Sequence, residues 1–210
     1  MRDATPRRIE AKDTAVVLVE FQRQWTDRGL FNRLIRTQLE PRSVIENTRR
    51  LVAAARTLGV TVIHAPLVID PQSKKGWMTY PTFGRLFTKG TWRSELVPGV
   101  YGKGDPIAER GHYNLQAFDA FHNSELDDIL RRRGIHNVFV CGFATDQCPS
   151  RTMRTANRRG FDAFLVSDCT ATFTRLLQRR AENRDGGTRS VTSQELLTLL
   201  GAETPAPTSQ

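Results

Sequence analysis

The sequence predicts one α/β domain in three layers (α/β/α), with helices covering both faces of a mainly parallel, Rossmann-like central sheet. The first observation is that short apolar runs rich in β-branched residues alternate with longer segments of helical spacing. The second is that these runs are continuously apolar, which is typical of strands buried on both faces. The third is the length of 210 residues, which fits one large domain better than two small ones. We place the domain at residues 13–201 and expect residues 1–12 and 202–210 to be flexible termini.

Four apolar runs are predicted to be buried strands. The clearest is Ala15-Val16-Val17-Leu18-Val19, which contains no polar residue. The four predicted strands cover residues 15–19, 60–64, 137–141 and 161–166.

The segments between and after these strands are predicted to be helices, several of them ended by a glycine. The predicted helices cover residues 44–58, 126–133, about 146–159, 173–182 and 193–200. Residues 67–104 are irregular and rich in Gly, Pro and aromatic residues. Because this segment is too long for a simple connection, we expect it to shape a site or an interface.

The charge of the chain does not by itself indicate a nucleic-acid partner. The 31 Lys and Arg residues exceed the 22 Asp and Glu residues, for a formal net charge of +9. The basic residues are nevertheless scattered in short groups, such as Arg7-Arg8 and Arg131 to Arg133. We therefore expect an Arg-rich solvated surface and no nucleic-acid partner.

Other features indicate a cytoplasmic protein with no membrane partner. The longest nearly apolar run, Thr14 to Val19, is far too short to span a bilayer, and the N-terminus lacks the apolar region of a secretory signal. The three cysteines, Cys141, Cys148 and Cys169, are an odd number without a CxxC pair. This pattern argues against a disulfide framework.

Two polar residues follow predicted strands, at the sheet edge where parallel sheets place their sites. Glu20 follows the first strand, and Cys148 lies in the first turn of the helix after the third. The N–H groups and dipole of a helix start favour a thiolate and can hold an oxyanion, while a carboxylate within reach can move the thiol proton. The pattern alone leaves two interpretations open, since many cysteines at helix starts are inert and many such glutamates cap a helix or pair with an Arg.

A longer motif narrows the interpretation. Gly142-Phe143-Ala144-Thr145-Asp146-Gln147-Cys148, followed by Thr152-Met153-Arg154-Thr155-Ala156 and a strand ending at Asp168, resembles the nucleophile region of isochorismatase-like cysteine hydrolases. That family includes nicotinamidases, N-carbamoylsarcosine amidohydrolases, biuret hydrolases and ureidoacrylate hydrolases. Glu20-Phe21-Gln22 and Lys89-Gly90-Thr91-Trp92 are similar to one of its branches.

The resemblance implies roles for the residues that match the motif. Cys148 would be the nucleophile, and Glu20, in place of the family's usual Asp, the general base. The peptide bond between Phe143 and Ala144 would be cis. The N–H of Ala144 or Thr145 would then face the oxyanion beside the N–H of Cys148.

The family's catalytic Lys has no counterpart in this chain. Depending on the alignment, the matching position is Leu115 or His112. His112, Arg110 and Lys89 are the nearby cations able to replace it. We favour His112 as the third catalytic residue, with a surface or helix-cap role as its alternative.

The expected function is a cofactor-free hydrolase that cleaves a C–N bond in a small amide or ureide-like molecule through a thioester. We expect the substrate to contact Gln22, Trp25, Trp92 and Tyr113. The four histidines are dispersed and no Asp-x-His spacing follows Glu20, so no metal is expected. The alternative is a family member that lost hydrolysis with its Lys and acts as a binding protein or a redirected biosynthetic enzyme. Since family members are commonly dimers or tetramers, we expect a homodimer or homotetramer.

Overall fold

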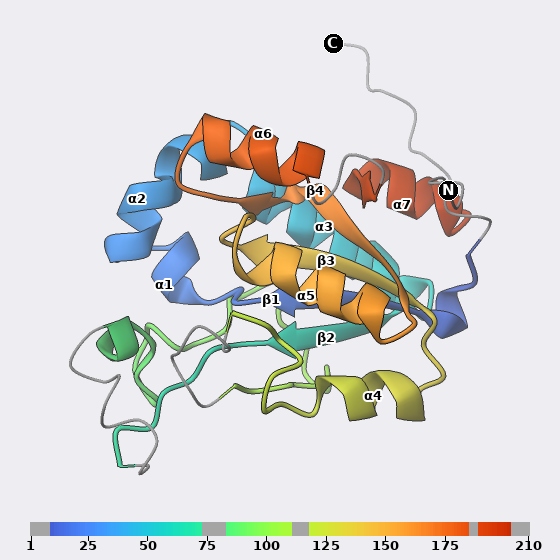
Figure 1. Ribbon diagram of the computed structural model, residues 1–210, viewed down its shortest axis with the longest axis horizontal. Helices are drawn as coiled ribbons and strands as arrows, with labels where there is room; N and C mark the ends of the chain where they lie inside the picture. Colours follow the sequence, from blue (N-terminus) through green and yellow to red (C-terminus); the bar gives the residue numbers. More distant parts are fainter. Residues whose placement is uncertain (1–8, 73–82, 111–117, 185–188, 203–210) are drawn as a thin grey trace.

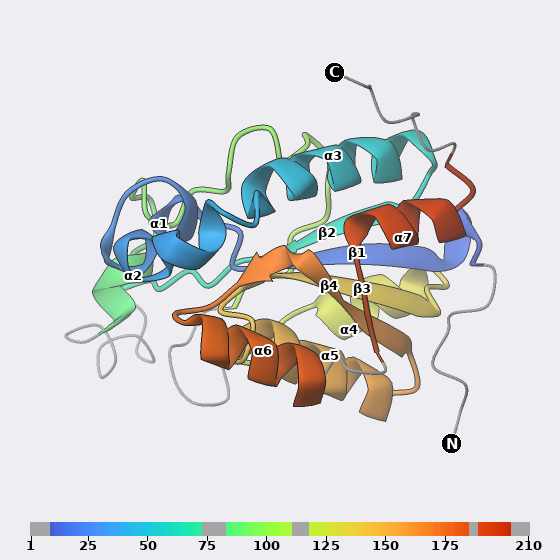
Figure 2. The same ribbon diagram turned by 90° about the horizontal axis from the view of Figure 1, so that it is seen from above.

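A parallel sheet forms the middle layer of the molecule (Figures 1 and 2). The computed structural model describes residues 9–72, 83–110, 118–184 and 189–202. Within these residues the sheet has five strands in the order β2-β1-β3-β4-β5, and all neighbouring strands are parallel. The strands are β1 Thr14–Val19, β2 Thr61–Ala65, β3 Asn137–Phe143, β4 Asp162–Ala171 and β5 Ser190–Val191. The predicted fold class is confirmed.

Helices cover both faces of this sheet. Figure 2 shows α3 and α7 on one face and α4 and α5 on the other, with α1 and α2 beyond one end of the sheet. The helices are α1 Arg23–Thr26, α2 Leu30–Leu39, α3 Val44–Thr57, α4 Leu126–Arg132, α5 Cys148–Arg158, α6 Arg175–Arg184 and α7 Ser193–Leu199. Two short 3₁₀ segments are η1 Ala11–Asp13 and η2 Phe83–Phe87. No helix in the described parts of the chain is both long and apolar enough to cross a membrane.

The central strand β1 shows why the sequence contains unbroken apolar runs. All six of its residues are buried. Val16 and Leu18 belong to one hydrophobic cluster, together with residues of α3 and α7, whereas Val17 and Val19 belong to a second cluster with residues of α4 and α5. Because successive side chains point to opposite faces, both faces of the strand need apolar residues.

The elements differ from the predicted ones mainly at the edge of the sheet that carries the site. Strands β3 and β4 continue to Phe143 and Ala171, which pair with each other beyond an irregularity in the ladder. The predicted helix at about 146–159 begins at Cys148, since Gln147 donates its N–H to the carbonyl of Ala144 in a preceding turn. Helices α1 and α2 and strand β5 were not predicted from the sequence.

One extended segment, residues 105–110, lies beside β2 and carries a side chain into the site. Bridges pair His64 with Ile107 and Leu67 with Arg110 in parallel register. Asp105 anchors the start of this segment, because its carboxylate accepts hydrogen bonds from the Arg56 guanidinium at 2.5 and 3.2 Å and lies 3.1 Å from His64 Nε2. The segment therefore ends at a defined place next to the carboxyl end of β2.

Candidate active site

Glu20 lies directly beyond the carboxyl end of β1, in a left-handed backbone conformation with φ of 55°. Its N–H donates to the carbonyl of Ala65 at 3.1 Å, which fixes the turn against the end of β2. The residue is buried, at 2% exposure. A left-handed conformation costs a non-glycine residue about 1 kcal/mol or more. Here it places a carboxylate at the edge of the sheet.

Cys148 lies against this carboxylate, at the start of the helix that follows the neighbouring strand β3. It is the first residue of α5, and its thiol donates to Glu20 Oε1 at an Sγ–Oε1 distance of 2.9 Å. The two residues are far apart in the sequence, but β1 and β3 are neighbours in the sheet. The structure therefore brings together the predicted nucleophile and the predicted base.

Arg110 supplies the cation of the cluster. Its Nη2 donates to the same Glu20 oxygen at 3.0 Å and to the carbonyl of Ala65 at 3.1 Å. Arg110 is 1% exposed, which makes this a buried ion pair. Arg110 was one of the three cations that the sequence analysis considered, but not the favoured one. The favoured residue, His112, lies outside the described residues, and the third, Lys89, is exposed.

Trp25 holds the other oxygen of the carboxylate. Its indole Nε1–H donates to Glu20 Oε2 at 3.2 Å. The sequence analysis expected Trp25 to contact substrate, and the structure adds this hydrogen bond to Glu20. The two oxygens of Glu20 therefore have different partners: the thiol and a guanidinium on Oε1, and an indole on Oε2.

The protonation of Cys148 differs from the sequence expectation. Burial raises the pKa of the Cys148 thiol well above its ordinary value, and the negative charge of Glu20 raises it further, while Arg110 works in the opposite direction. The helix start was expected to favour a thiolate. Because desolvation penalises the charged form, the resting thiol is instead protonated at neutral pH.

The loop between β3 and α5 forms the remaining wall of the site. The peptide bond between Phe143 and Ala144 is cis. The N–H of Thr145 donates to the carbonyl of Ala171 at 3.1 Å, so this group holds the end of β4. Of the two N–H groups considered for the oxyanion beside that of Cys148, that of Thr145 is thus already bonded, and that of Ala144 stays a prediction. The N–H of Cys148 belongs to the first turn of α5, where helix geometry provides no intrahelical acceptor.

A cavity of about 340 Å³ opens onto the thiol and the carboxylate. Glu20, Cys148, Gln147 and Ala144 form its reactive end. The described residues that complete its lining are all aromatic: Trp25, Phe31, Phe87, Phe118 and Phe173. The reacting groups therefore lie in a mostly apolar enclosure.

Two residues that were expected to contact substrate have other partners. Gln22 is fully buried, and its amide donates to the carbonyls of Leu67 and Ser94 and accepts the Leu67 N–H. These bonds give Gln22 a supporting role, and its contact with substrate stays a prediction. Trp92 is outside the described lining of the cavity, and the guanidinium groups of Arg28 and Arg93 each lie 5.1 Å from its ring centroid. Tyr113 lies outside the described residues.

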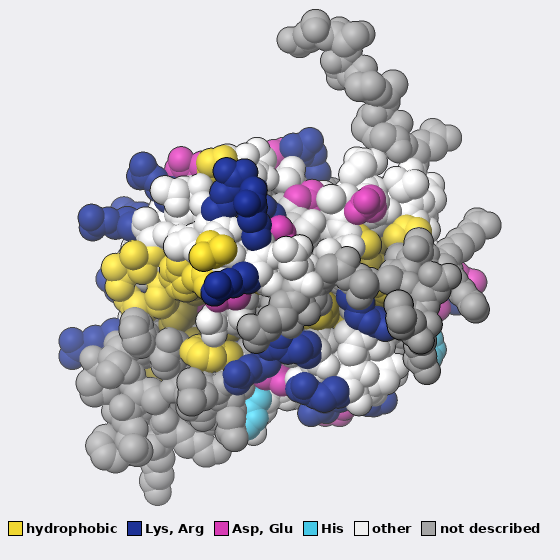
Figure 3. Space-filling model, turned by 45° about the horizontal axis from the view of Figure 1, so that its top comes forward, with side chains coloured by type: hydrophobic (Ala, Val, Ile, Leu, Met, Phe, Trp, Pro, Cys, Tyr) yellow, Lys and Arg dark blue, Asp and Glu magenta, His cyan; other side chains and the backbone are white. Residues whose placement is uncertain are grey.

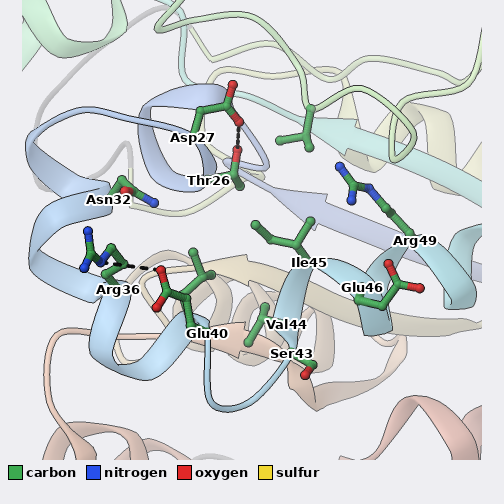
Figure 4. Close-up of a pocket in the computed structure, with 12 residues that line it drawn as sticks. Thr26, Asp27, Asn32, Arg36, Glu40, Ser43, Val44, Ile45, Glu46 and Arg49 are labelled. Atoms are coloured by element: carbon green, nitrogen blue, oxygen red, sulfur yellow. Dashed lines mark hydrogen bonds and ion pairs between the residues drawn. The ribbon is translucent and has the colours of Figure 1, made fainter.

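A second hollow, of about 480 Å³, lies between α2 and the start of α3 (Figure 4). Charged side chains of both signs line it, and Arg36 pairs with Glu40 at 3.4 Å. Its described lining includes neither Cys nor His. In the described parts of the chain, no three His, Cys, Asp or Glu residues are grouped as metal ligands would be.

The fold and the site together define a class of protein, namely a three-layer α/β protein with a Cys, a carboxylate and a cation at the carboxyl edge of a parallel sheet. Within that class, the chain belongs to the isochorismatase family of hydrolases, because the isochorismatase domain of that family matches residues 14–193. The resemblance noted in the sequence is thereby confirmed.

Relatives and solved structures agree with this assignment. The chain is 28% identical over 184 residues to the ureidoacrylate amidohydrolase RutB of Azorhizobium caulinodans, which covers 79% of each chain. It is 30% identical over 172 residues to the protein of the same name from Acinetobacter baylyi, covering 72% of this chain and 68% of that one.

Solved structures share the fold. A cysteine hydrolase from Pseudomonas syringae pv. phaseolicola superimposes with a TM-score of 0.81 at 20% identity, covering 94% of this chain and 96% of that one. The N-carbamoylsarcosine amidase of Thermoplasma acidophilum superimposes with a TM-score of 0.68 at 22% identity, covering 86% and 96%. At family level, the matching domain and the amidohydrolase relatives support a hydrolase that acts on amide or ureide C–N bonds.

Proposed function

We propose that the protein is a cysteine amidohydrolase that cleaves a C–N bond in a small amide or ureide-like molecule through a thioester intermediate. The observation that carries the proposal is the 2.9 Å contact between the Cys148 thiol and Glu20 Oε1, two residues that line the same cavity. A nucleophile and a base within hydrogen-bond distance are what acyl transfer requires. The amidohydrolase relatives support the choice of bond.

In the proposed reaction Glu20 removes the thiol proton as Cys148 Sγ attacks the substrate carbonyl. The N–H groups of Ala144 and Cys148 then stabilise the negative oxygen of the tetrahedral intermediate. Glu20 returns the proton to the departing nitrogen, which leaves as ammonia or an amine, and a thioester remains on Cys148. Water then attacks the thioester with Glu20 as its base, which releases the acid and restores the thiol.

The presence of Arg110 beside Glu20 argues against the alternative in which hydrolysis is lost. That alternative depended on the absence of a Lys at the matching position of the sequence. Arg110 lies against Glu20, where a cation is needed to stabilise a buried carboxylate. We therefore propose that Arg110 takes the positioning role and that hydrolysis is retained.

The test measures ammonia release from a panel of small amides and ureides. Cys148→Ala should abolish release, whereas the matched control Cys141→Ala, a change at a buried cysteine of the core, should retain it. Intact-mass spectrometry on rapidly quenched wild type should detect an acyl adduct that Cys148→Ala lacks. Turnover that survives in Cys148→Ala would refute the proposal.

The oligomeric state and the compartment stay predictions. We propose a homodimer or homotetramer, and light scattering on the purified protein would decide this. A monomer at micromolar concentration would contradict it.

A further inference from the structure

Among the described residues that line the cavity, Gln147 is the one polar side chain beyond the reacting Glu20 and Cys148. Trp25, Phe31 and Phe87 form its inner wall and are at most 8% exposed. Phe118 and Phe173, which are half-buried, complete the aromatic lining. Figure 3 shows hydrophobic side chains gathered on the surface at the end of the molecule that carries α1 and α2.

The aromatic rings pack against one another as a continuous wall. The rings of Trp25 and Phe31 stack with centroids 4.4 Å apart and planes 11° apart. Phe31 in turn lies 5.7 Å from Phe87 and 6.5 Å from Phe173, measured between ring centroids. Rings fixed in this way present a preformed apolar surface and lose little entropy when a substrate group packs on them.

The charged groups around the cavity also favour an uncharged substrate. Glu20 is the one charged side chain among the described lining residues, and it is negative. Arg110 binds the Glu20 carboxylate and is outside that described lining. A carboxylate on the substrate would therefore lie against the negative faces of aromatic rings, beside a Glu20 whose charge Arg110 already pairs, with no described cation of the lining to pair with it.

We propose that the part of the substrate that does not react is uncharged and apolar, such as an aryl or short alkyl group attached to the scissile amide. This inference rests on the proposed function and narrows its substrate class. It separates the chain from relatives named for ureidoacrylate, a substrate with a carboxylate. The cavity volume of about 340 Å³ fits a molecule of a single ring.

The experiment uses two amides of equal shape and different charge. In 4-acetylbenzamide a neutral acetyl group occupies the place of the carboxylate of 4-carbamoylbenzoate. Ammonia release gives kcat/KM for each, and calorimetry gives Kd for each on Cys148→Ala. We expect the neutral amide to be favoured at least about tenfold in both measurements, because an unpaired buried charge is costly. A smaller ratio, or a preference for the carboxylate, would overturn the inference.

A change at the mouth of the cavity tests the cause of the preference. Phe173→Lys places a cation in the lining and should reduce the preference for the neutral amide at least about threefold, whereas Phe173→Met should keep it. If Phe173→Lys leaves the ratio unchanged, charge is not the cause and the inference fails.

The two proposals can fail separately. If neither amide is hydrolysed and Cys148 forms no adduct, the proposed function fails while the ratio of Kd values still decides the inference. If neither amide binds at millimolar concentration, the inference fails as well.

Discussion

The buried ion pair between Arg110 and Glu20 gives the sharpest prediction, because both side chains are at most 3% exposed. Arg110→Met keeps an unbranched side chain of comparable reach and removes the guanidinium. It leaves the Glu20 carboxylate buried, with the thiol and the indole of Trp25 as its remaining described partners. A buried charge that loses its partner is expected to destabilise the fold strongly.

The magnitude follows from the separation of the charges. At the observed 3.0 Å between Nη2 and Oε1, an effective dielectric constant of about 20 gives about 5 kcal/mol as an upper bound. Breaking a buried pair by removing one partner typically costs about 3–5 kcal/mol. We therefore expect Arg110→Met to lower the free energy of unfolding by about 3 kcal/mol or more, and kcat/KM to fall at least about a hundredfold because the base is no longer held.

Chemical denaturation of four proteins, namely wild type, Arg110→Met, Glu20→Gln and the double variant, measures the coupling directly. The two changes should be non-additive by at least about 2 kcal/mol, since each single change leaves one buried group unpaired. Arg110→Lys keeps the charge and loses the fixed guanidinium geometry, so it should cost about 1–2 kcal/mol. If the single changes add within about 0.5 kcal/mol, the pair does not act as described here.

Three further predictions concern the thiol, the indole and the end of β3. Because the pKa of Cys148 is raised, the thiol is protonated below that pKa, so alkylation by iodoacetamide should be slow at pH 7 and accelerate only above about pH 8.5. Burial is the largest cause of this raised pKa and the charge of Glu20 is the second, so Glu20→Gln should shift the alkylation profile to lower pH while abolishing turnover; a wild-type midpoint below pH 7 would contradict this. Trp25→Phe keeps an aromatic ring but removes the donor to Oε2, so kcat should fall about tenfold and its pH profile should shift; an unshifted profile would argue against a positioning role. In Gly142→Ala the new Cβ would lie 1.9 Å from a backbone oxygen of β1, so the free energy of unfolding should fall by more than about 3 kcal/mol, against about 1 kcal/mol for Gly134→Ala, where space is open. Denaturation curves of the two glycine variants that coincide would contradict this.

The parts of the fold that depend on local composition could be predicted from the sequence. An unbroken apolar run such as that of β1 indicates a strand with two buried faces, and the edge at which such strands end indicates where a site lies. Helix α2 was missed although Phe31, Ile35 and Leu39, its buried apolar residues, follow helical spacing. The pattern was present, but the surrounding charged residues obscured it.

The identity of the cation could not be predicted, because it depends on contacts between distant segments. Arg110 reaches Glu20 because residues 105–110 pair beside β2, and Asp105 holds that segment through Arg56 and His64. The number of residues between a motif and Arg110 does not show that residues 105–110 lie beside β2. Neither alignment of the Lys position, the one that gives Leu115 or the one that gives His112, reaches Arg110, because loops do not keep a fixed length.

The raised pKa of Cys148 and the proposed chemistry support each other. A thiol that ionised freely would need no base, and a carboxylate beside it would only oppose the thiolate. A protonated thiol 2.9 Å from a carboxylate is instead ready to lose its proton as the sulfur attacks, so no free thiolate has to form in the apolar cavity. The transferred proton then lies on Glu20, which is where the departing nitrogen needs it. Arg110 and Trp25 hold that carboxylate from the other sides, so that the same group can first accept and then donate the proton without moving.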